Sequence, residues 1–255
     1  MPNLHFVKQG RGPAVVLSHA LGCDLSMWDA TADLLAPGHT VLRYDHRGHG
    51  KSEVVPGPCS IEDMADDAAA LIAAQVEGPV HFVGLSMGGM VAQQIAVRHP
   101  ELVTSIVIAN SSSCYDEAAR GMWRARMATV LSQGMGAIGD AAMQRWFTPE
   151  FRADVDGRRQ VAALRAVLER TDAKAYAAAC DAVSRIEFFR TNPLIACPAL
   201  VIAGTRDEAT PPAMSEAICK SISGAELTSL DAAHLSAVER PGEFAGLVAQ
   251  FIRGL

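Results

Sequence analysis

The sequence lacks the features typical of membrane and nucleic-acid-binding proteins. Lysine and arginine number 22 against 28 acidic residues, for a net charge of −6, and no basic cluster is interleaved with aromatic residues. No apolar stretch reaches the roughly 18 residues that a membrane-spanning helix needs. We therefore expect no nucleic-acid partner and no membrane partner.

Cysteine is sparse and unpatterned. The six cysteines are scattered, with no C-x-x-C pair and no metal-ligand spacing. We expect free thiols acting as small buried hydrophobes, no metal site and no cofactor. The opening residues also lack the basic region and the apolar run of about 7–15 residues that mark a secretory signal. These observations together predict a cytoplasmic protein.

Short apolar runs recur along the chain and indicate a buried parallel sheet. They are rich in β-branched residues, as is typical of strands covered on both faces. The predicted strands are 14–18, 40–44, 80–85, 105–109, 199–203 and 226–230. Helical patterns at 61–76, with Ser60 as N-cap, and at 87–99 separate some of them. The alternation predicts an α/β fold, a mostly parallel central sheet with helices on both faces.

The segment from 114 to 190 departs from this alternation. It predicts only short helices, around 122–131, 141–147, 158–170 and 173–183. Residues 116–190 hold 11 arginines and 1 lysine against 10 acidic residues, a net charge of +2, so the remainder carries −8. We interpret residues 114–190 as a helical cap inserted into a core of residues 1–113 and 191–255. A cationic cap suits an anionic substrate, although arginines also commonly solvate exposed helices.

The stretch G-L-S-M-G, residues 84–88, lies where a predicted strand gives way to a predicted helix. In that context G-x-S-x-G is a sharp turn that exposes a serine hydroxyl, here Ser86, as a nucleophile. A serine needs a base, and the base needs an orienting carboxylate, in the chain order Ser, acid, His. Asp207 follows a predicted strand, and His234 lies on the loop after the next one. We predict Ser86, His234 and Asp207 as a triad, with Asp231 as the rival acid.

The loop after the first predicted strand reads S-H-A-L-G and is expected to complete an oxyanion hole. The backbone N–H groups of Leu21 and Met87 are the predicted donors. His19 could serve as a second base, but a loop-shaping role fits better. The stretch Y-D-H-R-G-H-G-K-S, residues 44–52, is interpreted as a structural turn despite its aspartate and two histidines.

These motifs together resemble the α/β-hydrolase superfamily over essentially the whole chain. The resemblance rests on S-H-A-L-G, Y-D-H-R-G-H-G-K-S, G-L-S-M-G-G, G-T-R-D and A-A-H-L-S. Within that superfamily the chain is most similar to the 3-oxoadipate enol-lactonases. The finer matches are L-G-C-D-L-S-M-W-D, S-I-E-D-M-A-D-D, the pair Trp146-Phe147 and H-L-S-A-V-E-R-P. The run His19–Gly22 departs from the polar N-S-L-G-like run of those lactonases and is closer to general esterases.

The resemblance implies cofactor-free opening of a carboxylate-bearing enol-lactone through an acyl-enzyme, in the degradation of aromatic compounds. A cation of the cap should then bind the substrate carboxylate. The candidates are Arg124, Arg126 and Arg145, with Trp146 as a wall of the pocket.

Three alternatives remain open. A broad carboxylesterase and a carbon–carbon bond hydrolase would keep the same triad and differ in the cap. A ligand receptor on a hydrolase fold would keep the triad without turnover. Ser86 argues against dehalogenases and epoxide hydrolases of this fold, because those enzymes need an aspartate nucleophile. The sequence does not indicate an oligomeric state.

Overall fold

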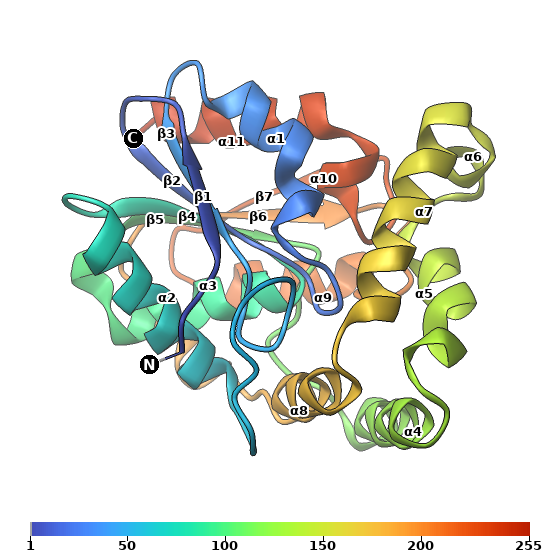
Figure 1. Cartoon of the computed structure of the whole chain (residues 1–255). Helices are drawn as coiled ribbons and strands as arrows, with labels where there is room; N and C mark the ends of the chain where they lie inside the picture. The colour runs from blue at the N-terminus through green and yellow to red at the C-terminus, as the bar shows by residue number, and fades with distance from the viewer. Residues whose placement is uncertain (1) are drawn as a thin grey trace.

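The strands form where the sequence places short β-branched and aliphatic runs. The computed structural model describes residues 2–255 and pairs seven strands in the order β1-β3-β2-β4-β5-β6-β7 (Figure 1). The strands are β1 (Phe6–Gln9), β2 (Ala14–Ser18), β3 (Thr40–Tyr44), β4 (Val80–Leu85), β5 (Val103–Ala109), β6 (Ala199–Gly204) and β7 (Glu226–Leu230). The predicted α/β fold with a mostly parallel sheet is confirmed.

Burial differs between the centre and the edges of the sheet. Every residue of β4 and β6 is buried, whereas the edge strands β1 and β7 are partly exposed. β1 pairs antiparallel with β3 and all other pairs are parallel. The short, half-polar β1 was not predicted, because four residues F-V-K-Q show no clear apolar run. The parallel strands end together at one edge of the sheet, where Leu85 pairs with Ala109 and Gly204 with Leu230.

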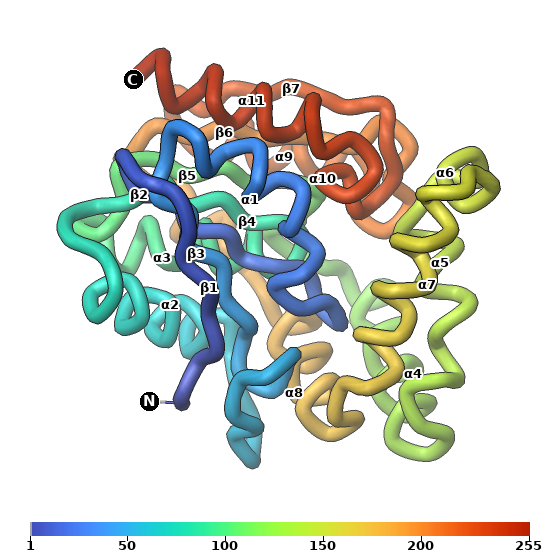
Figure 2. The backbone as a smooth tube through the Cα atoms, turned by 45° about the horizontal axis from the view of Figure 1, so that its top comes forward, coloured from blue at the N-terminus to red at the C-terminus, as the bar shows by residue number. Residues whose placement is uncertain are grey.

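Helices cover both faces of the sheet (Figures 1 and 2). α1 (Asp29–Leu35) and α11 (Pro241–Arg253) pack together on one face, and α2 (Ile61–Gln75), α3 (Met87–Arg98) and α9 (Pro212–Ser221) lie on the other. The short α10 (Ser236–Glu239) precedes α11. At the start of α2 the Ser60 hydroxyl accepts from the Asp63 N–H at 3.1 Å, and the Asp63 carboxylate accepts from the Ser60 N–H at 2.8 Å. This reciprocal cap explains why the helix begins where the sequence predicts.

Five further helices lie between β5 and β6, and we call residues 117–184 the helical segment. They are α4 (Glu117–Gln133), α5 (Gly139–Trp146), α6 (Pro149–Ala153), α7 (Val155–Arg170) and α8 (Ala173–Ser184). Figures 1 and 2 show them together beside the edge of the sheet where the parallel strands end. Four correspond to predicted helices, and the five-residue α6 was too short to predict. In the described residues no helix is long and apolar enough to cross a bilayer.

Candidate active site

The turn between β4 and α3 holds Ser86 in a conformation that few residues adopt. Ser86 has a positive φ of 57° and its N–H donates to the Ala109 carbonyl at 2.9 Å. The flanking glycines are required by space, because a Cβ at Gly84 would overlap the Gly88 carbonyl and a Cβ at Gly88 would overlap the Ser18 carbonyl. A non-glycine residue at positive φ is a strained feature that is common at functional sites. The predicted strand–turn–helix context of G-x-S-x-G is therefore present.

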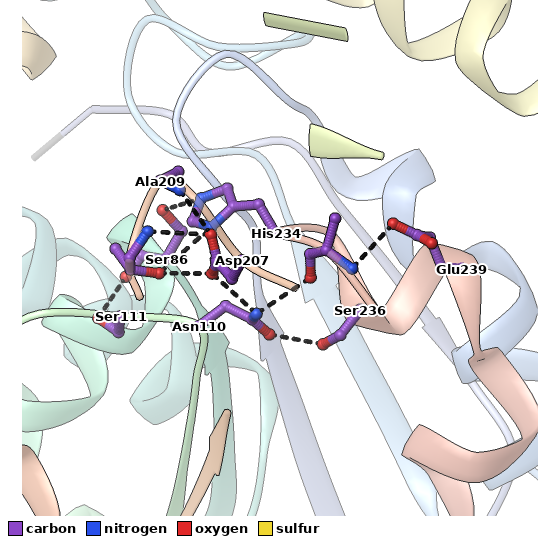
Figure 3. Close-up of polar contacts among 10 residues, drawn as sticks. Ser86, Asn110, Ser111, Asp207, Ala209, His234, Ser236 and Glu239 are labelled. Atoms are coloured by element: carbon purple, nitrogen blue, oxygen red, sulfur yellow. Dashed lines mark hydrogen bonds and ion pairs between the residues drawn. The ribbon is translucent and has the colours of Figure 1, made fainter. Parts of the chain in front are cut away.

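The three side chains of the predicted triad lie together at the carboxyl ends of three strands. Ser86 Oγ lies 2.9 Å from His234 Nε2, and His234 Nδ1 lies 2.9 Å from Asp207 Oδ2 (Figure 3). They follow β4, β6 and β7, and Ser86 lies more than a hundred residues before the other two in the chain. With Nδ1 protonated, the imidazole donates to the aspartate and its Nε2 accepts from the serine hydroxyl, as nucleophilic catalysis requires.

Asp207 is held as a charged acceptor. Its Oδ1 accepts from the N–H groups of Ala209 and Thr210 at 2.8 and 2.9 Å, and its Oδ2 accepts from the Thr210 hydroxyl at 2.7 Å. Burial acts to raise the pKa of Asp207, but the charge and hydrogen bond of His234, with the donors around it, lower that pKa to about 2. The rival Asp231 is exposed and contacts Thr205 and Arg206 instead of the histidine.

A cavity of about 710 Å³ opens onto the Ser86 and His234 side chains. Its wall combines Leu21 from the loop after β2 with residues of the helical segment and of the loop before α9. The lining residues from the helical segment include Met122, Trp123, Arg126, Ile138, Arg145, Trp146 and Tyr176. The predicted Leu21, Arg126, Arg145 and Trp146 thus lie at one cavity with Ser86. Arg124 does not line it and instead pairs with Glu117 on the exposed surface at 2.6 Å.

Comparison with known proteins agrees with this architecture. A family model described as the alpha/beta hydrolase fold matches residues 13–241. The chain belongs to the α/β-hydrolase fold family.

Similar members of this family include lactonases and esterases. "3-oxoadipate enol-lactonase 2" of Acinetobacter baylyi is 35% identical over 236 residues, covering 92% of this chain and 87% of the relative. The enol-lactonase crystal structure from Burkholderia xenovorans LB400 is 35% identical, with a TM-score of 0.94 over 99% of this chain and 97% of that one. A thermophilic esterase from Thermogutta terrifontis, solved with malate bound, is 27% identical, with a TM-score of 0.92 over 99% and 94%. The predicted class, a hydrolase of carboxylic esters, agrees with these findings.

Both predicted donors of the oxyanion hole lie beside the serine of this α/β-hydrolase. Met87 is the first residue of α3, directly after Ser86, where backbone N–H groups have no partner within the helix. Leu21 follows β2, in a turn closed by the Cys23 N–H donating to the Ala20 carbonyl at 3.1 Å. Gly22 has a φ of 77°, and a Cβ there would press on Leu168. Leu21 lines the same cavity as Ser86, as a donor to an oxyanion at that serine would require.

Two arginines of the cavity have no carboxylate partner among residues 2–255. The Arg126 guanidinium stacks over the Trp123 ring at 4.5 Å. Burial and the nearby charge of Arg126 lower the pKa of Arg145. Two like charges on one partly buried wall are unfavourable without a counter-charge. The arrangement therefore favours an anion between or beside the two guanidinium groups.

The two histidines of residues 44–52, His46 and His49, lie against His19 and not against Ser86. His19 Nε2 accepts from the His46 N–H at 2.9 Å, and His46 Nε2 lies 2.9 Å from the Ser18 hydroxyl. The His19 and His49 rings lie 5.3 Å apart. Asp45 accepts from backbone N–H groups of two loops. These contacts agree with a loop-shaping role for this cluster, as we interpret the motif.

Several residues at the site carry no signal in the sequence. Asn110, Thr210, Tyr115 and Tyr176 each contact the triad or line the cavity, yet none stands in a recognisable motif. For Asn110 and Thr210 the only available hint is position, one residue after β5 and on the loop after β6. Polar residues directly after parallel strands gather at one edge of the sheet, so that position could have drawn attention to Asn110 and Thr210.

Proposed function

We propose that this hydrolase opens a small carboxylate-bearing enol-lactone, of the 3-oxoadipate enol-lactone type, in the degradation of aromatic compounds. The observation that carries the proposal is the Ser86–His234–Asp207 arrangement facing a cavity with two unpaired arginines. The similarity to enol-lactonases at 30–35% identity supports it. A cytoplasmic location belongs to the same proposal.

The proposed reaction begins with proton transfer from Ser86 Oγ to His234 Nε2. The serine oxygen attacks the lactone carbonyl, and the N–H groups of Leu21 and Met87 stabilise the oxyanion. Collapse breaks the ring carbon–oxygen bond, and the enolate that leaves stays attached through the rest of the acyl chain. It takes up the proton held on His234 and ketonises, which favours ring opening and leaves the imidazole neutral.

Water then completes the proposed cycle. His234 takes a proton from the water, hydroxide attacks the acyl-enzyme, and the serine recovers its proton as the free acid leaves. Asp207 stays ionised throughout, orienting the imidazole and stabilising its charged form. Its lowered pKa, about 2, keeps the carboxylate ionised at neutral pH.

In this proposal residues 114–190 act as the cap, which supplies the charge and the walls of the binding site. Arg126 or Arg145 binds the substrate carboxylate and Trp146 closes the wall of the cavity. An arginine pairs with a carboxylate through two parallel hydrogen bonds, so it fixes orientation as well as charge. The lactone carbonyl can then be presented to Ser86 in one pose.

The test compares two substrates and two arginines. kcat/KM is measured on freshly generated 3-oxoadipate enol-lactone and on uncharged p-nitrophenyl acetate. A lactone value above about 10⁵ M⁻¹s⁻¹ is expected of a native substrate. Arg145→Ala should lose about 10–100-fold on the lactone alone, the effect of one hydrogen-bonded charge. Arg124→Ala is the matched control, because that arginine pairs with Glu117 outside the cavity. Equal losses on both substrates would contradict carboxylate binding by Arg145.

A broad carboxylesterase is the second candidate, favoured by the cavity size. A volume of about 710 Å³ lies in the range of pockets that hold drug-sized ligands, which are larger than a small lactone. Slow lactone turnover beside fast acetate turnover would support the esterase. Turnover of neither substrate would support the receptor alternative.

A further inference from the structure

Asn110 shares a rare backbone feature with Ser86. Among residues 2–255, these two are the only non-glycine residues with positive φ, which is 47° at Asn110. Asn110 directly follows β5 and is fully buried. Asparagine tolerates the left-handed region better than other non-glycine residues, yet the conformation is uncommon and clusters at functional sites.

The Asn110 side chain makes three hydrogen bonds around the triad, and both of its N–H donors are used (Figure 3). Its Nδ2 donates to Asp207 Oδ2 at 3.0 Å and to the Ala233 carbonyl at 3.2 Å. Its Oδ1 accepts from the Ser236 hydroxyl at 2.6 Å. One planar amide therefore joins the acid, the residue before the histidine and the start of α10.

We propose that Asn110 is a positioning residue, whose amide fixes the Asp207 carboxylate and the His234 loop relative to each other. The inference rests on the proposed function, because it assigns Asn110 to the triad that performs it. Asn110 touches neither Ser86 Oγ nor the cavity wall, so it acts through Asp207 and His234.

The donors on Asp207 Oδ2 explain why the amide matters. This oxygen also accepts from the Thr210 hydroxyl at 2.7 Å and from His234 Nδ1 at 2.9 Å. With the Asn110 N–H, three donors approach this oxygen from different directions. Together they fix the rotation of the carboxylate about its terminal bond. The second N–H holds the backbone just before His234. Misplacement of a catalytic group by about 1 Å can cost about 10²-fold in rate.

The chemistry selects asparagine at this position. An aspartate has the same shape but no N–H, and its charge would repel Asp207. A glycine adopts the same backbone without strain but contributes no side chain. Gly204 also leaves room for the amide, because a Cβ at that position would lie 2.6 Å from Asn110 Nδ2. Asn110→Gly therefore removes the amide and keeps the backbone conformation. Asn110→Asp removes the N–H donors and keeps the shape of the side chain.

Other charged and titratable groups surround the histidine and are unchanged in these variants. Asp207 and Glu239 lie on the core side, with Glu239 accepting from the Ala233 N–H at 3.1 Å. Glu208, Tyr115, Arg126 and Arg145 line the cavity that His234 faces. A change in the pH profile of an Asn110 variant can therefore be assigned to the substituted side chain.

The experiment measures kcat, KM and the pH profile of kcat/KM with p-nitrophenyl acetate as substrate. The concentration of active sites is determined from the burst of p-nitrophenol released by a p-nitrophenyl organophosphate, and kcat is expressed per active site. Both variants are expected to lose about 10–100-fold in kcat, with KM within about threefold of wild type. Asn110→Asp should also shift the acid limb of the pH profile, because it places a second carboxylate beside Asp207.

The matched control is Asn192→Ala. Asn192 is also fully buried, and its Nδ2 lies 2.9–3.0 Å from side-chain oxygens of Gln93, Ser113 and Ser221, away from the triad. It should lower the melting temperature and leave the acid limb and the kcat per counted site unchanged. If the Asn110 variants behave in the same way, Asn110 is only structural and the inference is wrong.

Ser236→Ala keeps the test decisive if either Asn110 variant fails to fold. It removes the partner of Asn110 Oδ1 and leaves both N–H donors in place. We expect a loss in kcat smaller than that of Asn110→Gly, and an unchanged kcat would contradict the inference.

A wild-type protein without an organophosphate burst would overturn the proposed hydrolase function itself. A normal burst and normal turnover, beside unaffected Asn110 variants, would overturn only the positioning role.

Discussion

His234 and Asp207, after β7 and β6, are joined at 2.9 Å, and His5 and Asp45, beside β1 and β3, are joined at the same distance. Both aspartates are buried, and both accept backbone N–H groups as well as an imidazole. The pairs differ in what else meets the histidine. His234 Nε2 lies against the Ser86 hydroxyl, whereas the His5 side chain is 31% exposed.

A histidine paired with a buried aspartate is therefore not in itself a catalytic feature. Asp45 joins the loop at Leu25 to the turn at Lys51, with N–H to carboxylate distances of 2.7 and 2.8 Å. That is a structural task, since it satisfies buried backbone groups of two segments. The pair at His234 differs because a strained turn brings a nucleophile to its second nitrogen.

The largest expected effect on activity comes from changes at the His234–Asp207 pair and its serine. Ser86→Ala and His234→Ala should each lower kcat by at least about 10⁴-fold, because nucleophile and base act as one unit. The melting temperature should change little. His5→Ala, measured in parallel, should keep the wild-type kcat. A folded Ser86→Ala protein with most of its activity would mean that the triad is misassigned.

Replacing each aspartate by asparagine should affect activity at Asp207 and stability at Asp45. Asp207→Asn should reduce kcat by about 10³–10⁴-fold, because the imidazole loses its orientation and tautomer. Asp45→Asn should cost about 1–3 kcal/mol in the free energy of unfolding, because buried N–H groups lose a charged acceptor. Its kcat per folded molecule should stay near wild type. Chemical denaturation and initial rates of the two variants measure both quantities, and a reversed pattern would contradict the comparison.

Acid should destabilise the region of Asp45 before that of Asp207. Burial and the nearby His19 lower the pKa of His49 to about 3, against about 6.5 in the unfolded chain. The folded state therefore binds fewer protons, so this stability is complete above about pH 6.5 and is lost as pH falls toward 3. The pKa of Asp207 falls to about 2, so its contribution is lost only below about pH 4.

Melting temperatures between pH 7 and 4.5 test this order. The wild type should lose at least about 4 °C over that range, given the size of the chain. His49→Gln should lose less, because one of the buried histidines no longer titrates. Identical curves for the two proteins would rule out His49 as a source of the acid sensitivity.

The smallest expected effect is on stability and concerns the His5–Asp45 pair. His5→Ala removes a half-exposed partner of Asp45, while the N–H donors from Leu25 and Lys51 remain. We expect a loss of about 1 kcal/mol in the free energy of unfolding. A loss above about 3 kcal/mol would show that His5 contributes far more than one exposed hydrogen bond.

Six of the seven strands were predicted, the central ones because their runs are apolar on both faces, whereas the short and half-exposed β1 was not. Ser86, Asp207 and His234 were predicted from motifs that follow strands, and the structure places them together. Arg124 was indistinguishable from Arg126 in the sequence, since both lie on one helix two residues apart. Only packing decides which of two such neighbours faces the cavity.

Asn110 illustrates what local patterns omit. Its partner Asp207 lies 97 residues away, and nothing in the run S-I-V-I-A-N distinguishes this asparagine from one in an ordinary turn. The contact follows from the parallel order of β5 and β6, which only the assembled sheet defines.

Glu239 joins the loop of His234 to the helical segment, and this has a consequence for exchanging that segment between relatives. Its carboxylate accepts from the Thr148 N–H and hydroxyl at 3.0 and 2.8 Å, and from the Ala233 N–H at 3.1 Å. The Leu235 N–H donates to the Trp146 carbonyl at 3.1 Å. A chimera that imports foreign helices between β5 and β6 would change the cavity walls in one step. It would keep the inherited chemistry only if the graft also carries a threonine matching Thr148.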